Sequence, residues 1–212
     1  MVVMRKALSC LALSAALVIA VEAYASPIQI TVDTSSVVAV DASLIFDLID
    51  GGDGPTPSSV KIYDFSTDGT LVGLPQIDGD VTGTLPGTFS NPLILADGAF
   101  FNDYLRSITL GTFITFIFDP SEVAAVDTPD GFSFLLLDPS GNSVIPTSDE
   151  TGALLLYSIG NPDPLQVFSS AVTVGPNAVP EPASYAIVIA ALLAFGVAHR
   201  LRQSRPQQKM RG

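Results

Sequence analysis

The chain has 212 residues, enough for one domain with accessory segments, and 9 basic against 21 acidic residues give a formal net charge of −12. A protein this acidic is a poor partner for nucleic acid, whose phosphates are bound by lysine and arginine. With 48% hydrophobic residues the chain is too apolar to be disordered. One cysteine and one histidine exclude a disulfide framework and most metal sites built from those residues.

The N-terminus has the three parts of a secretory signal peptide, which we expect to be a helix over residues 1–25. Two basic residues, Arg5 and Lys6, precede an apolar stretch, and a small-x-small cleavage pattern follows it. The residues of that pattern and the first mature residue are Ala23, Ala25 and Ser26. A lipoprotein signal at Cys10 is the weaker alternative, because only about three apolar residues precede that cysteine.

The exported body, residues 26–178, is much more acidic than the whole chain. Over residues 26–179 there are 19 acidic residues against two basic ones, Lys61 and Arg106, so the net charge is −17. The same stretch has no cysteine, histidine, tryptophan or methionine. Its length is sufficient for a single hydrophobic core.

Short apolar or alternating runs rich in β-branched and aromatic residues recur through the body and predict strands. The predicted strands are residues 28–32, 37–40, 44–48, 60–65, 107–118, 132–137, 153–159 and 165–174. Turns are predicted at the Asp-Gly pairs 50–51, 53–54, 68–69, 78–79, 97–98 and 130–131. We therefore expect an all-β fold, a single antiparallel β-sandwich of jelly-roll-like topology, between an N-terminal signal helix and a C-terminal transmembrane helix.

The C-terminal region, residues 179–212, has three parts in a fixed order. The motif Val179, Pro180, Glu181 and Pro182 comes first, and residues 183–198 form an apolar stretch without charge. The tail, residues 199–212, is basic, with Arg200, Arg202 and Arg205 closest to the apolar stretch. Sixteen helical residues span about 24 Å, and the arginines can extend to the far interface, so a transmembrane helix with a cytoplasmic tail is predicted.

This arrangement resembles the PEP-CTERM sorting signal of Gram-negative bacteria that produce exopolysaccharide. The resemblance implies export through the general secretion machinery, transient anchoring in the membrane, and processing near Pro-Glu-Pro by an exosortase. The implied destination is the cell surface or the extracellular matrix. The resemblance covers only about the last 30 residues and concerns sorting, not activity.

The body is similar to that of a group of PEP-CTERM-tailed exported proteins to which we can attach no biochemical activity. The likeness is carried by residues 46–50, 100–102 and 129–138, by Gly141-Asn142 and residues 145–147, and by residues 152–155. It implies the extent of the domain and supplies no site.

Two kinds of ligand are suggested by the residues of the body. Aspartates near glycines offer the oxygen ligands that calcium prefers, although none follows the spacing of an EF-hand. The predicted calcium ligands are Asp47, Asp50, Asp53, Asp78 and Asp80, with Asp127 and Asp130 as a further cluster. The alternative explanation is that Asp-Gly pairs only form turns.

Carbohydrate binding needs exposed aromatic rings, and Tyr63, Tyr104 and Tyr157 are the predicted platforms, since the phenylalanines lie largely in strands and fit a core. The body contains no histidine or cysteine for nucleophilic catalysis, so we expect no enzyme and no cofactor apart from structural calcium. The leading expectation is a structural or interaction protein of the matrix, with a carbohydrate- or calcium-binding module as the alternative. Its expected partners are the exosortase, the membrane and exopolysaccharide.

Overall fold

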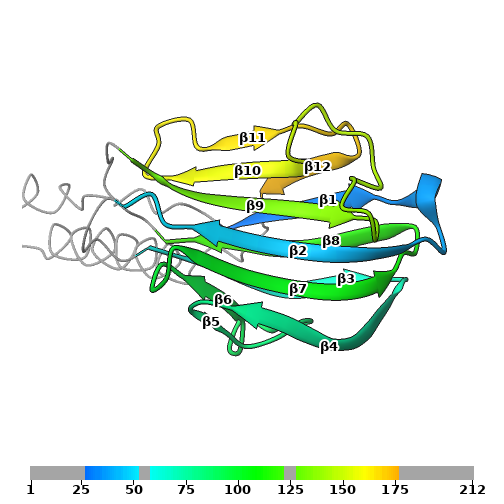
Figure 1. Cartoon of the computed structure of the whole chain (residues 1–212), viewed down its shortest axis with the longest axis horizontal. Helices are drawn as coiled ribbons and strands as arrows, with labels where there is room; N and C mark the ends of the chain where they lie inside the picture. Colours follow the sequence, from blue (N-terminus) through cyan, green and yellow to red (C-terminus); the bar gives the residue numbers. More distant parts are fainter. Residues whose placement is uncertain (1–26, 53–57, 122–127, 177–212) are drawn as a thin grey trace, which may run out of the picture. The chain divides into compact units, whose positions relative to one another are not determined.

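The computed structural model describes residues 27–52, 58–121 and 128–176, which fold into two six-stranded antiparallel sheets (Figure 1). These ranges contain no α-helix and no helix that is long and apolar enough to cross a bilayer. The predicted signal helix and transmembrane helix lie outside the described residues. The expected all-β sandwich is confirmed.

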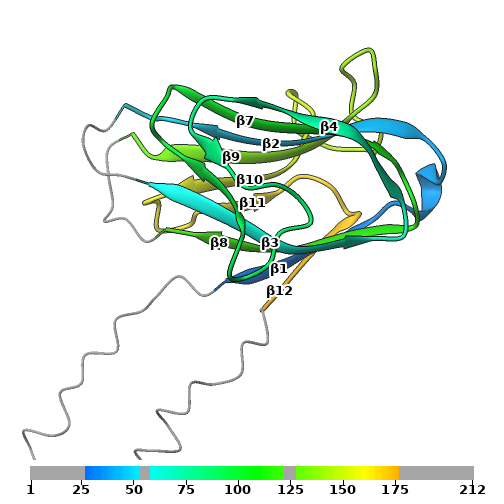
Figure 2. The same ribbon diagram turned by 90° about the horizontal axis from the view of Figure 1, so that it is seen from below.

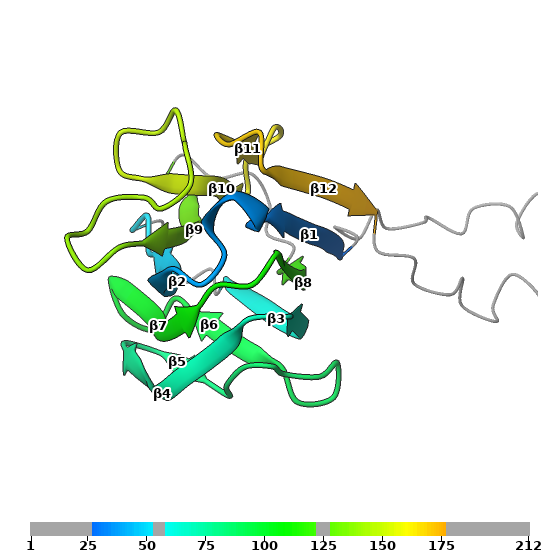
Figure 3. The same cartoon turned by 90° about the vertical axis from the view of Figure 1, so that its right-hand side faces the viewer.

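One sheet, here called sheet A, contains both ends of the described chain. In spatial order its strands are β12 (Val172–Pro176), β1 (Ile28–Asp33), β8 (Phe113–Pro120), β3 (Ser59–Thr67), β6 (Leu93–Ala96) and β5 (Val81–Thr82). Figure 3 shows β1 and β12 side by side, and Ile28 pairs directly with Pro176. The described chain therefore enters and leaves the sandwich at neighbouring points.

The other sheet, sheet B, is built around two long central strands. In spatial order its strands are β11 (Leu165–Val167), β10 (Ala153–Ile159), β9 (Asp130–Leu137), β2 (Asp41–Ile49), β7 (Phe101–Thr109) and β4 (Thr70–Asp78). Strand β2 pairs along its whole length with β7 and over seven residues with β9. Sheet B thus has a continuous, regular outer face across β9, β2 and β7.

The core lies between the two sheets, which Figure 2 shows as separate layers. Strand β2 alternates strictly, with Leu44, Phe46 and Leu48 fully buried and the residues between them facing outward. The Phe46 ring packs edge-on against Phe116 of sheet A, with ring centroids 5.2 Å apart, and lies 5.4 Å from Phe134. Aromatic pairs of this kind fix the two layers against each other.

The predicted strand at residues 37–40 is wrong. A short 3₁₀ turn, Ser35–Val37, begins after Thr34, and the Asp33 carboxylate accepts a hydrogen bond from Ser35 N at 2.9 Å. Ala39 has φ of 62°, and Val38 is half exposed. The apolar run is therefore a loop, and its backbone is held at the turn after β7, where Ala39 N donates to Leu110 O at 2.8 Å and Leu110 N donates to Val40 O at 2.9 Å.

Two other predicted strands are each divided in two by a turn. Residues 107–118 contain the end of β7 and most of β8, and the turn at 110–112 is held by Thr34 Oγ1, which donates to Gly111 O at 2.8 Å. Residues 165–174 contain β11 and part of β12. Strands β4, β5 and β6 were not predicted. The Asp-Gly turns at 68–69 and 97–98 lie between strands as expected, and at 78–79 Asp78 ends β4 and Gly79 begins the turn, whereas Asp130-Gly131 begins β9.

Candidate functional site

Most of the aspartates in the loops bind backbone N–H groups. Asp68 is the clearest case, because its carboxylate accepts hydrogen bonds from Thr112 N and Thr112 Oγ1, both at 2.7 Å, and from Phe113 N at 3.2 Å. These bonds, above all that from the Thr112 hydroxyl, lower the pKa of Asp68. The pKa is lowered in the same way, by hydrogen bonds from nearby residues, for Asp33, Asp138 and Asp149. We call these four the capping aspartates.

Asp130, predicted with Asp127 as a further calcium cluster, has a structural role in the fold. Its side chain is buried, one oxygen accepts a hydrogen bond from Gly51 N at 2.7 Å, and the other accepts one from Ser58 Oγ. It thereby ties the end of β2 and the start of β3 to β9. Asp127 lies outside the described residues.

Three aspartates form a row across the outer face of sheet B. Asp47 of β2 pairs directly with Asp103 of β7, and Asp103 pairs with Asp78 of β4. Directly opposed residues of antiparallel strands project from the same face, with Cβ atoms about 4.5–5.5 Å apart. We call Asp47, Asp103 and Asp78 the aspartate row.

The surroundings of Asp47 disfavour the ionised form of its carboxylate. Burial first, and then the adjacent Asp103 carboxylate, raise its pKa to about 7 against the opposing effect of a hydrogen bond with the Ser133 side chain. Its Oδ1 atom is buried and accepts no hydrogen bond. A group with this pKa exchanges its proton near neutral pH, which ordinary surface aspartates do not.

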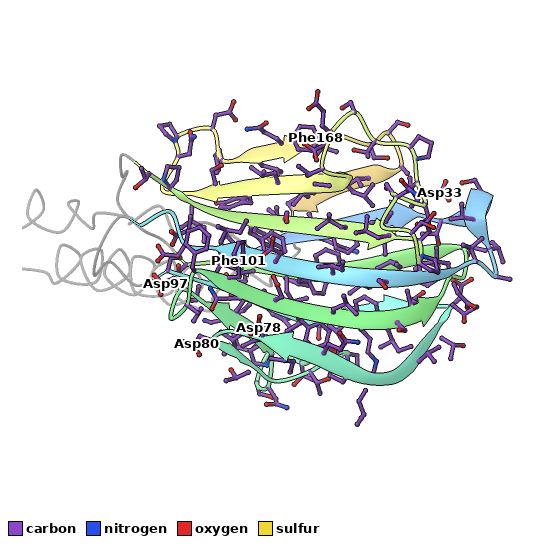
Figure 4. The ribbon with its side chains drawn as sticks, in the orientation of Figure 1. Asp33, Asp78, Asp80, Asp97, Phe101 and Phe168 are labelled. Carbon is purple, nitrogen blue, oxygen red and sulfur yellow. The ribbon has the colours of Figure 1, made fainter. Side chains whose placement is uncertain are left out.

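Two exposed phenylalanines lie beside the aspartate row. Phe100 is 60% and Phe101 52% exposed, and their rings stand edge to face with centroids 4.6 Å apart. Phe101 is two residues before Asp103 on the same face of β7, and Ile49 of β2 lies opposite it. In Figure 4, Phe101 lies at the same end of the sandwich as Asp78, Asp80 and Asp97. We call Phe100 and Phe101 the aromatic pair.

A buried amide holds the loop that carries the aromatic pair. Asn102 Nδ2 donates to Ala99 O at 2.6 Å and to Leu48 O at 3.1 Å, while its Oδ1 accepts a hydrogen bond from Asp80 N at 2.8 Å. Asp50 N donates to Phe100 O at 3.1 Å. The turns before β5 and before β7 are therefore joined to the end of β2.

The structure divides the predicted calcium ligands between two places. Asp47 and Asp78 belong to the aspartate row, Asp50 and Asp80 lie in the turns around the aromatic pair, and Asp53 is outside the described residues. The row covers two strand spacings, about 9–10 Å, whereas a calcium ion binds its oxygens at about 2.3–2.6 Å. Among residues 27–52, 58–121 and 128–176, no three potential ligands are close enough together to hold a metal ion.

The predicted aromatic platforms are wrong for two of the three tyrosines. Tyr104 is fully buried, with its hydroxyl 3.2 Å from Leu85 N, and Tyr63 is also buried. Tyr157 is half-buried and packs against Phe118, with centroids 5.0 Å apart. The exposed aromatic pair was missed, although it stands just after an Asp-Gly turn and outside every predicted strand. Asp103 was missed too, because only strand pairing places it between Asp47 and Asp78.

The signal-peptide cleavage pattern, the Pro-Glu-Pro motif and the basic tail lie outside the described residues. Three segments of the body that carried its resemblance, 46–50, 100–102 and 129–138, include parts of the adjacent strands β2, β7 and β9 of sheet B. The fold and its site define an acidic two-sheet β-sandwich with exposed aromatic residues at one end. No family model, curated protein or solved structure matches the chain.

Proposed function

We propose that the chain is an exported structural or interaction protein of the cell surface or extracellular matrix, sorted and processed by an exosortase, without enzymatic activity. The observation that carries the proposal is the charge of the sandwich. Its described residues include 16 acidic and 2 basic residues, a net charge of −14. Such a surface keeps a secreted domain soluble and excludes polyanions from non-specific contact.

The same charge gives the proposed matrix role a physical mechanism. Copies of this sandwich repel one another at low ionic strength, and divalent cations can screen or bridge their carboxylates. The two basic side chains, Lys61 and Arg106, are too few to offset 16 acids. Association of the protein should therefore depend on cations.

The sorting step is tested by mass spectrometry of the protein from native cells and medium. We expect a new N-terminus at Ser26 and a C-terminus near Pro180-Glu181-Pro182 in the processed form. Full-length protein that keeps Arg200 to Gly212 in the membrane would contradict the processing step. Light scattering that stays flat as calcium or magnesium is added would contradict cation-driven association.

The second candidate function is carbohydrate binding, and the aromatic pair favours it. Phe100 and Phe101 together offer an exposed apolar surface, and Asp103 and Asp78 lie on the same sheet face as Phe101. Ligand sites commonly combine aromatic surfaces with a few polar groups that orient the ligand. Retention of the protein on a glycan matrix distinguishes this candidate from a purely structural role.

We also propose that the topology is jelly-roll-like. Strands β1, β8, β3 and β6 are neighbours in sheet A, while β2, β7 and β4 are neighbours in sheet B. The first four strands thus alternate between the sheets, as expected when a long antiparallel hairpin is rolled up into two layers. Strands β9 to β12 extend both sheets at one side.

A further inference from the structure

We propose that the aromatic pair is a docking platform for a neutral, hydroxyl-rich polysaccharide, whose hydroxyl groups donate hydrogen bonds to the surrounding aspartates. The inference rests on the second candidate function and gives it a site and a ligand class. It is carried by the exposure of the two rings, the rigidity of their loop and the charge around them.

Keeping both rings exposed gives up stabilisation that their burial in the core would provide. An apolar side chain kept in water forgoes about 25 cal/mol for each Å² left unburied. Phe46, Phe116 and Phe134 are buried in the core, whereas Phe100 and Phe101 are more than half exposed and touch each other at the surface. Exposed apolar side chains that are contiguous, rather than scattered singly, are typical of interaction sites.

The platform is also held in place before any ligand arrives. Phe101 begins β7, and the carbonyl of Phe100 accepts a hydrogen bond from Asp50 N at 3.1 Å. Asn102, directly after the pair, is fully buried and bonded to Leu48, Ala99 and Asp80. A preorganised surface loses less conformational entropy on binding than a mobile one.

The rings of Phe100 and Phe101 stand perpendicular to each other. The rings are inclined by 87°, so the face of one ring meets the edge of the other. An aromatic face carries the negative part of the ring quadrupole, which attracts the polarised C–H groups on the apolar face of a sugar ring. An exposed ring face therefore suits the apolar C–H face of a sugar ring.

The surrounding charge decides which polysaccharide fits. Asp103 and Asp78 lie on the same sheet face as Phe101, and Asp80 and Asp97 are in the adjoining turns. Ionised carboxylates only accept hydrogen bonds, so they suit hydroxyl groups and repel the carboxylates of acidic sugars. Among polysaccharides, the charge therefore favours a neutral one over an acidic one.

The test uses the full chain in nanodiscs and measures binding of two probes by isothermal titration calorimetry. The probes are cellohexaose, which is neutral, and hexagalacturonate, which has the same length and six carboxylates. The variants are Phe100→Ala and Phe101→Ala, with Phe101→Trp as the conservative replacement. Phe89→Ala is the matched control, because Phe89 is 76% exposed but lies in the loop between β5 and β6.

We expect cellohexaose to bind more tightly than hexagalacturonate. Phe100→Ala and Phe101→Ala should each weaken binding by about tenfold or more, as at an interface hot spot, whereas Phe101→Trp should keep it and Phe89→Ala change it less than twofold. Equal binding of both probes, unchanged binding in Phe101→Ala, or an equal loss in Phe89→Ala overturns the inference. Absence of any binding to the wild-type chain overturns it too, while the termini found by mass spectrometry test export and sorting separately.

Discussion

The capping aspartates and the aspartate row place the same side chain in opposite surroundings. Asp68 is exposed and receives three hydrogen bonds from Thr112 and Phe113, which lower its pKa. Asp47 is half-buried, faces the carboxylate of Asp103, and has its pKa raised to about 7. The first environment stabilises the ionised form, and the second opposes it.

The difference shows that the acidity of this protein has two separate origins. In the loops, ionised aspartates close turns by binding N–H groups that would otherwise lack a partner. On sheet B, aspartates oppose one another without a basic residue beside them in the row, which lowers stability. Acidic residues kept at such a cost fit a surface selected for contact, in agreement with the aromatic pair next to them.

The largest effect is expected where a carboxylate is both buried and fully bonded. Asp130→Ala leaves Gly51 N and Ser58 Oγ without their acceptor, so the free energy of unfolding should fall by about 2–4 kcal/mol. Urea denaturation of the wild type and the variant measures this change in the free energy of unfolding. The control Asp163→Ala, at an exposed position, should change stability by less than about 0.5 kcal/mol. Equal effects of the two variants would contradict the role of Asp130.

The pH dependence of Asp47 should be the next largest effect. Its pKa is raised from 3.8 to about 7, so the folded state holds a proton that the unfolded state releases, and stability falls as the pH rises through this window. Because the side chain is partly solvated, we expect a loss of roughly 1–2 kcal/mol. Asp47→Asn should remove that loss and stabilise the protein at pH 8. Denaturation of the wild type and of Asp47→Asn at several pH values measures both the loss and its removal. If stability fell with pH equally in the two proteins, the role given to Asp47 would be contradicted.

The capping aspartates should give the opposite pH dependence and a smaller effect. The pKa of Asp68 is lowered, so its contribution to stability is present above 3.8, its ordinary value, and is lost as the pH falls further. Asp68→Ala should lower Tm by a few degrees at pH 7 and have no effect in strong acid. Asp68→Asn, which keeps one acceptor oxygen, should lie between wild type and Asp68→Ala. A Tm deficit of Asp68→Ala that persists in strong acid would count against this role.

Calcium should change folding stability least. The aspartate row is too wide for one ion to bind all three carboxylates, so we expect 5 mM calcium to shift Tm by less than about 1 °C. Differential scanning calorimetry with and without calcium measures the shift. A larger rise that disappears in Asp103→Asn would show a calcium site on sheet B and would restore the prediction made from the sequence.

The strands that periodicity predicted well are those with one face buried in the core and the other exposed. Strands β2 and β9 alternate along their length, and both were recognised with small errors at their ends. The turn at residues 110–112 was missed because apolar and β-branched residues continue on both sides of Gly111, and the chain reverses there through contacts with Thr34 and Asp68. Strand β4 was missed because Gly73 and Pro75 interrupt its pattern, and its pairing shifts register at that point.

The site was harder to predict than the fold, because it is assembled by pairing between distant segments. Asp47 and Asp78 were singled out for their glycine neighbours, yet it is Asp103 that joins them into a row. The tyrosines were expected as exposed platforms because the phenylalanines fit a core, but the Tyr104 hydroxyl forms hydrogen bonds with Thr84 and Leu85 inside the fold. Phenylalanine was assigned to the core by type, and only burial distinguishes Phe46 from Phe101.

The pairing of Ile28 with Pro176 also determines how the sandwich can be combined with other sequences. Domains whose ends are adjacent can be inserted into a host loop or repeated along a polymer without separating the flanking segments. In such a polymer the sandwich would project to one side, and it would add almost nothing to the end-to-end length of the polymer. Spacing along such a polymer would depend on the linkers alone, so a designer could vary the distance between sandwiches without disturbing their fold.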